Sequence, residues 1–175
     1  SIGSIVLSSL NYFGIKPATI VQNTLTVVVV LIGLALVAGG FTNGEFGMHP
    51  PLGNGVGGVM IVLIMIPFLF VGFDVIPQIA SEVNAPPKFI GRILVSSIAV
   101  AILFYILIAI GVSTGLTPSQ LAETNLATAD AMANIFGNKM FGALLVFGGV
   151  AGIITSWNAF IIGGSRILYA MAERD

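Results

Sequence analysis

Charged residues are scarce in this sequence of 175 residues: only 7% are Asp, Glu, Lys or Arg, whereas 57% are hydrophobic. An average soluble domain has about 25% charged residues. Six basic residues stand against seven acidic ones, so the net charge is -1 and no basic surface is available for nucleic acid. Because so few charges cannot cover a globule of this size, we expect most of the surface to face a lipid bilayer.

Cysteine is absent, and histidine occurs once, at His49. The absence of cysteine excludes disulfides, thiolate metal ligands and a cysteine nucleophile. One histidine and seven scattered acidic residues provide neither a Ser-His-Asp set nor a pair of carboxylates. We therefore expect neither enzymatic activity nor a metal site.

Long apolar runs are what the sequence contains instead. A helix needs about 20 apolar residues to cross a hydrocarbon core about 30 Å thick. Four stretches meet this requirement, at residues 18–39, 58–83, 93–113 and 140–172. Residues 1–10 are too short to span and are interpreted as the end of a preceding helix, which makes the chain an internal fragment. The predicted fold class is an all-α membrane protein with four transmembrane helices.

The basic residues orient these helices. Five of the six lie on one side of the predicted membrane: Lys16, Lys88, Arg92, Arg166 and Arg174. The positive-inside rule makes that side cytoplasmic. Residues 84–92 then form a cytoplasmic loop, and residues 40–57 and 114–138 form extracellular loops.

The outer loop 114–138 carries local helix signals. Thr117-Pro118-Ser119-Gln120 matches a capping box with proline at the first helical position. A second short helix is expected at 128–136, with Met132, Ile135 and Phe136 on one side. We expect this second helix to lie along the membrane interface.

The stretch 58–83 is interrupted by Pro67, Gly72, Asp74 and Pro77. Proline removes a backbone donor and glycine adds backbone freedom, so residues 68–74 are expected to be unwound or sharply kinked. Unwound backbone at membrane depth marks a ligand site. An ionisable side chain at the bilayer centre costs about 2.5 to 3.5 kcal/mol, so Asp74 is expected to face the protein interior. The structural alternative is a proline kink in which Asp74 caps the second half of the helix.

A row of small residues follows the stretch 140–172. Its members recur every three or four positions and share one helical face: Gly148, Gly152, Ser156, Ala159 and Gly163. This face allows close approach of another helix. Asn158 is expected to point about a third of a turn away from it. Its amide needs partners in hydrocarbon, so a bond between helices and a position lining a ligand path both stay open. Packing alone explains Thr155 and Ser156.

Other polar residues give weaker signals. Gln22, Asn23 and Thr26 cluster in the first turns of the stretch 18–39 and favour the lipid–water interface over a binding site. His49 precedes Pro50-Pro51 and is expected in a solvated outer loop.

Three motifs in order resemble the amino acid-polyamine-organocation (APC) permeases. The run FLFVGFD at 68–74, followed by SEVNAP at 81–86 and Arg92, is similar to their sixth helix and the loop after it. Residues 164–175 resemble the end of their eighth helix, and residues 11–23 the start of their fifth. The resemblance covers nearly the whole chain.

The resemblance implies a LeuT-type fold of two inverted five-helix repeats, in which the four stretches are helices five to eight. The first, third and tenth helices then lie outside this chain. The substrate-binding residues implied are Phe68, Leu69, Phe70, Val71, Gly72, Phe73, Asp74 and Asn158. Phe68 matches the gating aromatic, and the unwound strip after it matches the backbone that holds an amino acid's carboxylate and amino groups.

The resemblance leaves the coupling ion open between Na⁺ and H⁺, and it implies no other cofactor. Thr155 and Ser156 fall near the place where sodium-coupled relatives have hydroxyl ligands, and are thus a candidate cation site. Val29 occupies the position at which proton-coupled members often carry a lysine. Ser81 and Ala85 also depart from the family's loop motif.

The function implied is that of a secondary active amino-acid permease in the plasma (inner) membrane, working by alternating access. Its partners would be an amino acid substrate, the lipid bilayer and the remaining helices of the transporter, with no nucleic acid. The alternative is a channel or structural membrane subunit without coupled transport. Since Asp74 is the one acidic residue deep in a predicted span, an ordinary amino acid is favoured over a polyamine.

Overall fold

The computed structural model describes Gly3, His49 and residues 15–47, 55–69, 72–73 and 86–172. These residues form helices and the turns between them, which confirms the predicted all-α class. The helices are α2 (Ile15–Asn43), α3 (Gly55–Leu69), α5 (Pro87–Gly115), α6 (Pro118–Glu123), α7 (Ala127–Ile135) and α8 (Lys139–Ala172).

Three of the helices are long and apolar enough to cross a membrane. The candidate spans are Thr19–Asn43, Lys88–Gly115 and Lys139–Tyr169, with mean hydropathies of 2.5, 2.9 and 1.8. Helix α3 is apolar, and its 15 residues are about 22 Å long at 1.5 Å per residue. Residues 70–71 and 74–83 of the predicted span 58–83 lie outside the described residues. Three of the four predicted spans are thus present at full length among the described residues.

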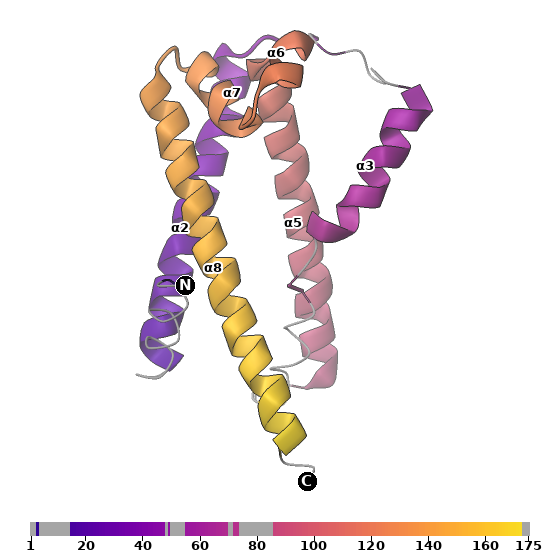
Figure 1. Cartoon of the computed structure of the whole chain (residues 1–175), viewed down its shortest axis with the longest axis vertical. Helices are drawn as coiled ribbons and strands as arrows, with labels where there is room; N and C mark the ends of the chain where they lie inside the picture. The colour runs from indigo at the N-terminus through magenta and orange to yellow at the C-terminus, as the bar shows by residue number, and fades with distance from the viewer. Residues whose placement is uncertain are drawn as a thin grey trace.

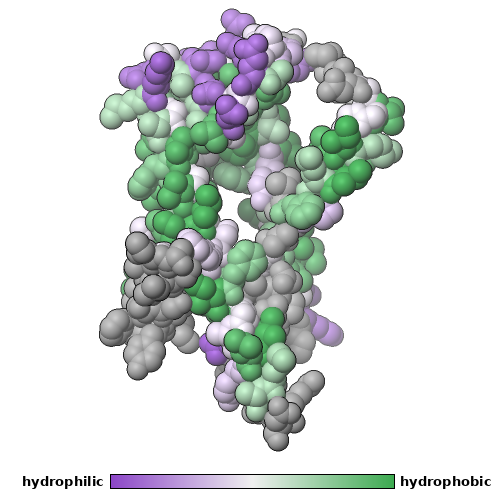
Figure 2. Space-filling view, in the orientation of Figure 1, coloured by the Kyte–Doolittle hydropathy of each residue, from purple (hydrophilic) through white to green (hydrophobic). Residues whose placement is uncertain are grey.

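Helices α2, α5 and α8 meet at one end of the molecule, beneath α6 and α7, whereas α3 stands apart from them (Figure 1). Polar side chains gather over α6 and α7 at this end, and apolar surface follows the long helices (Figure 2). The start of α5, with Lys88 and Arg92, and the end of α8, with Arg166, lie at the opposite end. The basic residues therefore segregate along the bundle as the sequence predicts.

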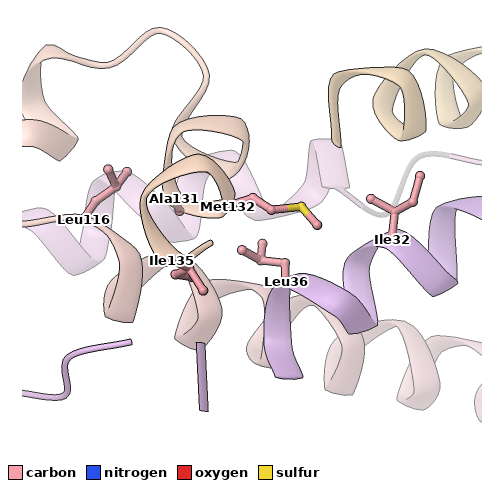
Figure 3. Close-up of a cluster of buried hydrophobic side chains, with 6 residues drawn as sticks. All are labelled: Ile32, Leu36, Leu116, Ala131, Met132 and Ile135. Atoms are coloured by element: carbon pink, nitrogen blue, oxygen red, sulfur yellow. The ribbon is translucent and has the colours of Figure 1, made fainter. Parts of the chain in front are cut away.

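A small core holds the upper ends of the helices together (Figure 3). Its members come from α2, α7 and the residue after α5: Ile32, Leu36, Leu116, Ala131, Met132 and Ile135. The side chains of Leu36 and Met132 are fully buried. Met132 and Ile135 lie on one face of α7, as expected, but that face packs on the other helices. This face thus packs on α2, α5 and α8, and the expectation that α7 lies along the membrane interface stays a prediction.

The capping box of α6 is confirmed. The backbone N–H of Gln120 donates to the Thr117 hydroxyl at 3.4 Å, and the Thr117 N–H donates to the Gln120 side-chain oxygen at 2.9 Å. Pro118 is the first helical residue. The signal was readable because all of its parts lie within four consecutive residues.

The loop after α2 is fixed to the end of α5. The Glu45 N–H donates to the Thr114 carbonyl at 2.9 Å, and Nε2 of His49 donates to the Leu116 carbonyl at 2.8 Å. The His49 ring is half-buried against a backbone acceptor that the end of α5 leaves unpaired within the helix. The expectation of a solvated outer loop stays a prediction.

Candidate functional site

The predicted interruption coincides with the end of α3. Pro67 lies in the last turn, the helix ends at Leu69, and Gly72 and Phe73 form a turn. Phe68 and Leu69 are still helical, which corrects the expectation that unwinding begins at Phe68. The reason is that a proline ring clashes with the turn before it, so residues after it can continue the helix.

The eight implied substrate residues are placed as follows. Phe68 is 78% exposed at the end of α3, and Gly72 and Phe73 are half-buried. Phe70, Val71 and Asp74 lie outside the described residues, as does the side chain of Leu69. The structure therefore positions Phe68, Gly72, Phe73 and Asn158, and these come from α3, the turn after it and α8.

Gly72 adopts a backbone conformation that other residues avoid. Its φ is +109°, in the region where L-residues are strained. A Cβ added there would have no atom within 4 Å. Glycine is therefore required at this turn by the backbone angle and not by a lack of space.

Helices α2 and α8 pack along an antiparallel seam. A Cβ at Gly148 would lie 3.0 Å from the side chain of Ile32, and one at Gly152 would lie 3.8 Å from that of Val29. Gln22 lies ten residues before Ile32 on α2, and Asn158 lies ten residues after Gly148 on α8. Because the two helices run antiparallel, this register places Gln22 opposite Asn158. We call the contacts from Ile32–Gly148 to Gln22–Asn158 the α2–α8 seam.

Asn158 belongs to this seam. Its side chain is 4% exposed, and its Nδ2 donates to Oε1 of Gln22 at 3.0 Å. Of the two alternatives for Asn158, the bond between helices is confirmed. The side chain lies on the face of α8 that packs on α2, and not a third of a turn away from the packing face. Among the buried positions of α8, Gly148, Ala151 and Asn158 form one row with the half-buried Thr155, at steps of three, four and three. Steps of four rotate a row of residues away from a straight partner helix, which explains why Ser156 is exposed.

Gln22 is the residue that sequence reasoning missed. It was interpreted as an interfacial residue, whereas its amide reaches across to α8. The available signal was its spacing of seven from Val29, which places both residues on one face of α2, and both contact α8.

The candidate cation ligands have separate environments. The Thr155 hydroxyl is half-buried and donates to the Gly152 carbonyl at 2.7 Å, while Ser156 is exposed. Successive helical residues point about 100° apart, so these two side chains leave α8 in different directions. No group of three or more His, Asp or Glu that could hold a metal ion occurs in the described parts of the chain.

Two cavities lie outside these positions. One of about 200 Å³ lies among α2, α5 and α8, with Val29, Phe104 and Tyr105 in its almost entirely apolar wall. A wider one of about 970 Å³ lies beside α6 and α7 and is lined in part by Asp130 and Lys139. Neither contains any of the implied substrate residues.

Three membrane-length apolar helices, two of them packed along the α2–α8 seam, define a multi-pass integral membrane protein. Residues 4–175 match the sequence profile of the family described as amino acid permease. The chain therefore belongs to the amino acid permease family, which confirms the resemblance to APC permeases.

Individual relatives carry transporter names. The chain is 24% identical to the branched-chain amino acid permease BcaP of Bacillus subtilis, a match that covers 95% of this chain and 36% of the relative. It is 29% identical to cationic amino acid transporter 9, chloroplastic, of Arabidopsis thaliana, over 93% of this chain and 28% of the relative. It is 28% identical to the aromatic amino acid transport protein AroP of Corynebacterium glutamicum, over 83% of this chain and 34% of the relative.

The chain thus spans about a third of the length of these curated relatives. No solved structure matches it. The relatives are permeases and transporters, which confirms the expectation that the chain is not an enzyme.

Proposed function

We propose that this chain is the central part of a secondary active amino-acid permease that works by alternating access in the plasma membrane. One observation carries the proposal: in a chain of the amino acid permease family, an apolar helix ends at Leu69 and is followed by a turn with positive φ at Gly72. Exposed peptide groups at such a break can bind the carboxylate and amino groups of an amino acid. The proposed architecture is a LeuT-type inverted repeat, with α2, α3, α5 and α8 in the places of helices five to eight.

The proposed substrate is an α-amino acid. The relatives are named for branched-chain, cationic and aromatic amino acids. These amino acids have only the α-amino and α-carboxyl groups in common, and backbone groups at the break can recognise both. Thr155 and Ser156 remain proposed ligands of a coupling Na⁺, with H⁺ as the alternative coupling ion.

Counterflow in liposomes tests the proposed function. Liposomes containing the full-length protein are loaded with unlabelled leucine, phenylalanine or lysine and diluted into buffer with a trace of the same labelled amino acid. A carrier exchanges internal for external substrate, so label is expected to accumulate transiently above its equilibrium level. A channel or structural subunit gives no such overshoot, and its absence with all three amino acids would contradict the proposal. Repeating the assay with an imposed Na⁺ or H⁺ gradient identifies the coupling ion.

Asp74 is expected to contribute to transport. In the full-length protein, Asp74→Asn should lower initial uptake several-fold or shift its pH dependence, because the amide has nearly the same shape but no titrating charge. The amount of protein in the membrane should stay unchanged. Asp130→Asn is the matched control, since Asp130 is exposed on α7 and bonds to Thr124. Equal uptake by Asp74→Asn and wild type at every pH would remove Asp74 from the proposed site.

A further inference from the structure

The hydrogen bond between Gln22 and Asn158 is a feature that substrate binding at the break does not explain. It joins side chains 136 residues apart, one from α2 and one from α8, at 3.0 Å. Asn158 is 4% exposed and is one of two buried polar residues in the described parts of the chain. A side-chain amide held this deeply between two apolar helices needs hydrogen-bond partners.

The position of the bond follows from the packing of the α2–α8 seam. The contacts of Ile32 with Gly148 and Val29 with Gly152 set the register of the two helices. This register brings Gln22 opposite Asn158 without further adjustment. Because α2 and α8 are held in register by apolar contacts elsewhere, the seam does not depend on the Gln22 amide for its alignment.

An asparagine side chain also has a broad χ2 preference, so packing alone fixes the direction of its amide only weakly. A bond from Nδ2 to Gln22 selects one orientation, and it thereby sets where the donor and acceptor atoms of Asn158 lie.

We propose that Gln22 is a positioning residue, which orients the side-chain amide of Asn158 for substrate binding. The inference rests on the proposed function and on the role in substrate binding that the resemblance to APC permeases implies for Asn158. Gln22 itself contacts Asn158 and not the substrate. It thus extends the site to α2, which carries none of the substrate residues implied by the sequence.

The test compares Gln22 variants of the full-length protein in liposomes, with whichever of leucine, phenylalanine and lysine the wild type takes up. Gln22→Leu has a similar size but no acceptor. It is expected to raise the KM for uptake about 3-fold to 30-fold, the range for loss of one hydrogen bond between membrane helices, with little change in Vmax. Asn23→Leu is the matched control, because Asn23 is the neighbouring amide on α2 and is exposed. It should leave KM unchanged.

The exchanged pair, Gln22→Asn with Asn158→Gln, separates positioning from simple packing. The two amides can still meet, since the combined side-chain length is unchanged, but the α8 amide is displaced by one methylene. The purified protein with the exchanged pair should have the melting temperature of the wild type, while its KM stays above the wild-type value. Recovery of both quantities would overturn the positioning role, as would a Gln22→Leu protein with wild-type KM. If the wild type takes up none of the amino acids, the proposed function itself fails and the inference with it.

Discussion

Gly72→Val is expected to reduce amino-acid uptake by the full-length protein about tenfold or more, while the protein still reaches the membrane. A non-glycine residue held at φ near +109° carries strain of about 1 to 3 kcal/mol, and a β-branched residue lies at the upper end. Each 1.4 kcal/mol is about a tenfold change in an equilibrium. The turn would relax to a negative φ, and the peptide groups proposed to bind the substrate would turn away. The measurement is the initial rate of uptake in liposomes, normalised to the amount of protein.

Gly57→Val is the control for this variant. Gly57 belongs to α3, and a Cβ there also has no atom within 4 Å, but its backbone is helical. The two variants therefore add the same side chain to equally open positions and differ in the φ that it must adopt. Equal loss of uptake in both would show that the turn at Gly72 has no special role.

Gly142→Val is expected to cause a large loss of folded protein. A Cβ at Gly142 would lie 2.8 Å from the backbone carbonyl oxygen of Ala129 and 3.3 Å from the Cβ of Ala133. A backbone atom cannot swing aside, so α7 would have to move away from α8. Overpacking of this kind costs about 1 to 3 kcal/mol, occasionally more. The melting temperature in detergent and the monodisperse fraction on gel filtration should both fall.

The matched control is Gly164→Val, on the same helix. Gly164 is exposed, and a Cβ there meets no atom within 4 Å. Valine has a better helix propensity than glycine, so this variant should be as stable as the wild type or slightly more so. If Gly142→Val had the same melting temperature as Gly164→Val, the result would contradict the packing of α7 on α8.

Features encoded within a few residues were predictable from the sequence. The capping box at Thr117 and the apolar face of α7 at Met132 and Ile135 are confirmed, because a helix start and a helix face depend on neighbours in the chain. The length and apolar character of three spans were equally readable, since the thickness of a bilayer fixes them.

Features that depend on a partner helix were not predictable. The row of small residues on α8 was recognised, but its spacing alone did not reveal that α2 packs against Asn158 and leaves Ser156 exposed. The Gln22–Asn158 bond and the His49–Leu116 bond likewise join segments whose approach is set by tertiary packing. Gln22 and His49 were assigned their most common environments, and each has a specific partner, whereas a bond between helices was one of the two alternatives for Asn158.

The location of the candidate site along the chain stays a prediction. Among the described residues, α3 ends at Leu69 and Gly72 lies in a turn, and the residue at which the helix ends depends on how far the turn after Pro67 continues. The roles of Phe68 and Asp74 came from the resemblance to APC permeases and remain predictions.

The sequence separation of Gln22 and Asn158 has a consequence during synthesis of the chain. Ribosomes add about 5 to 20 residues per second, so the 136 residues that separate the two amides take roughly 7 to 27 s to make. During that interval α2 enters the membrane before its partner on α8 exists, and the Gln22 amide must be satisfied by water at the interface or by the insertion machinery. The apolar remainder of α2, with a mean hydropathy of 2.5, has to retain the helix in the bilayer until α8 arrives.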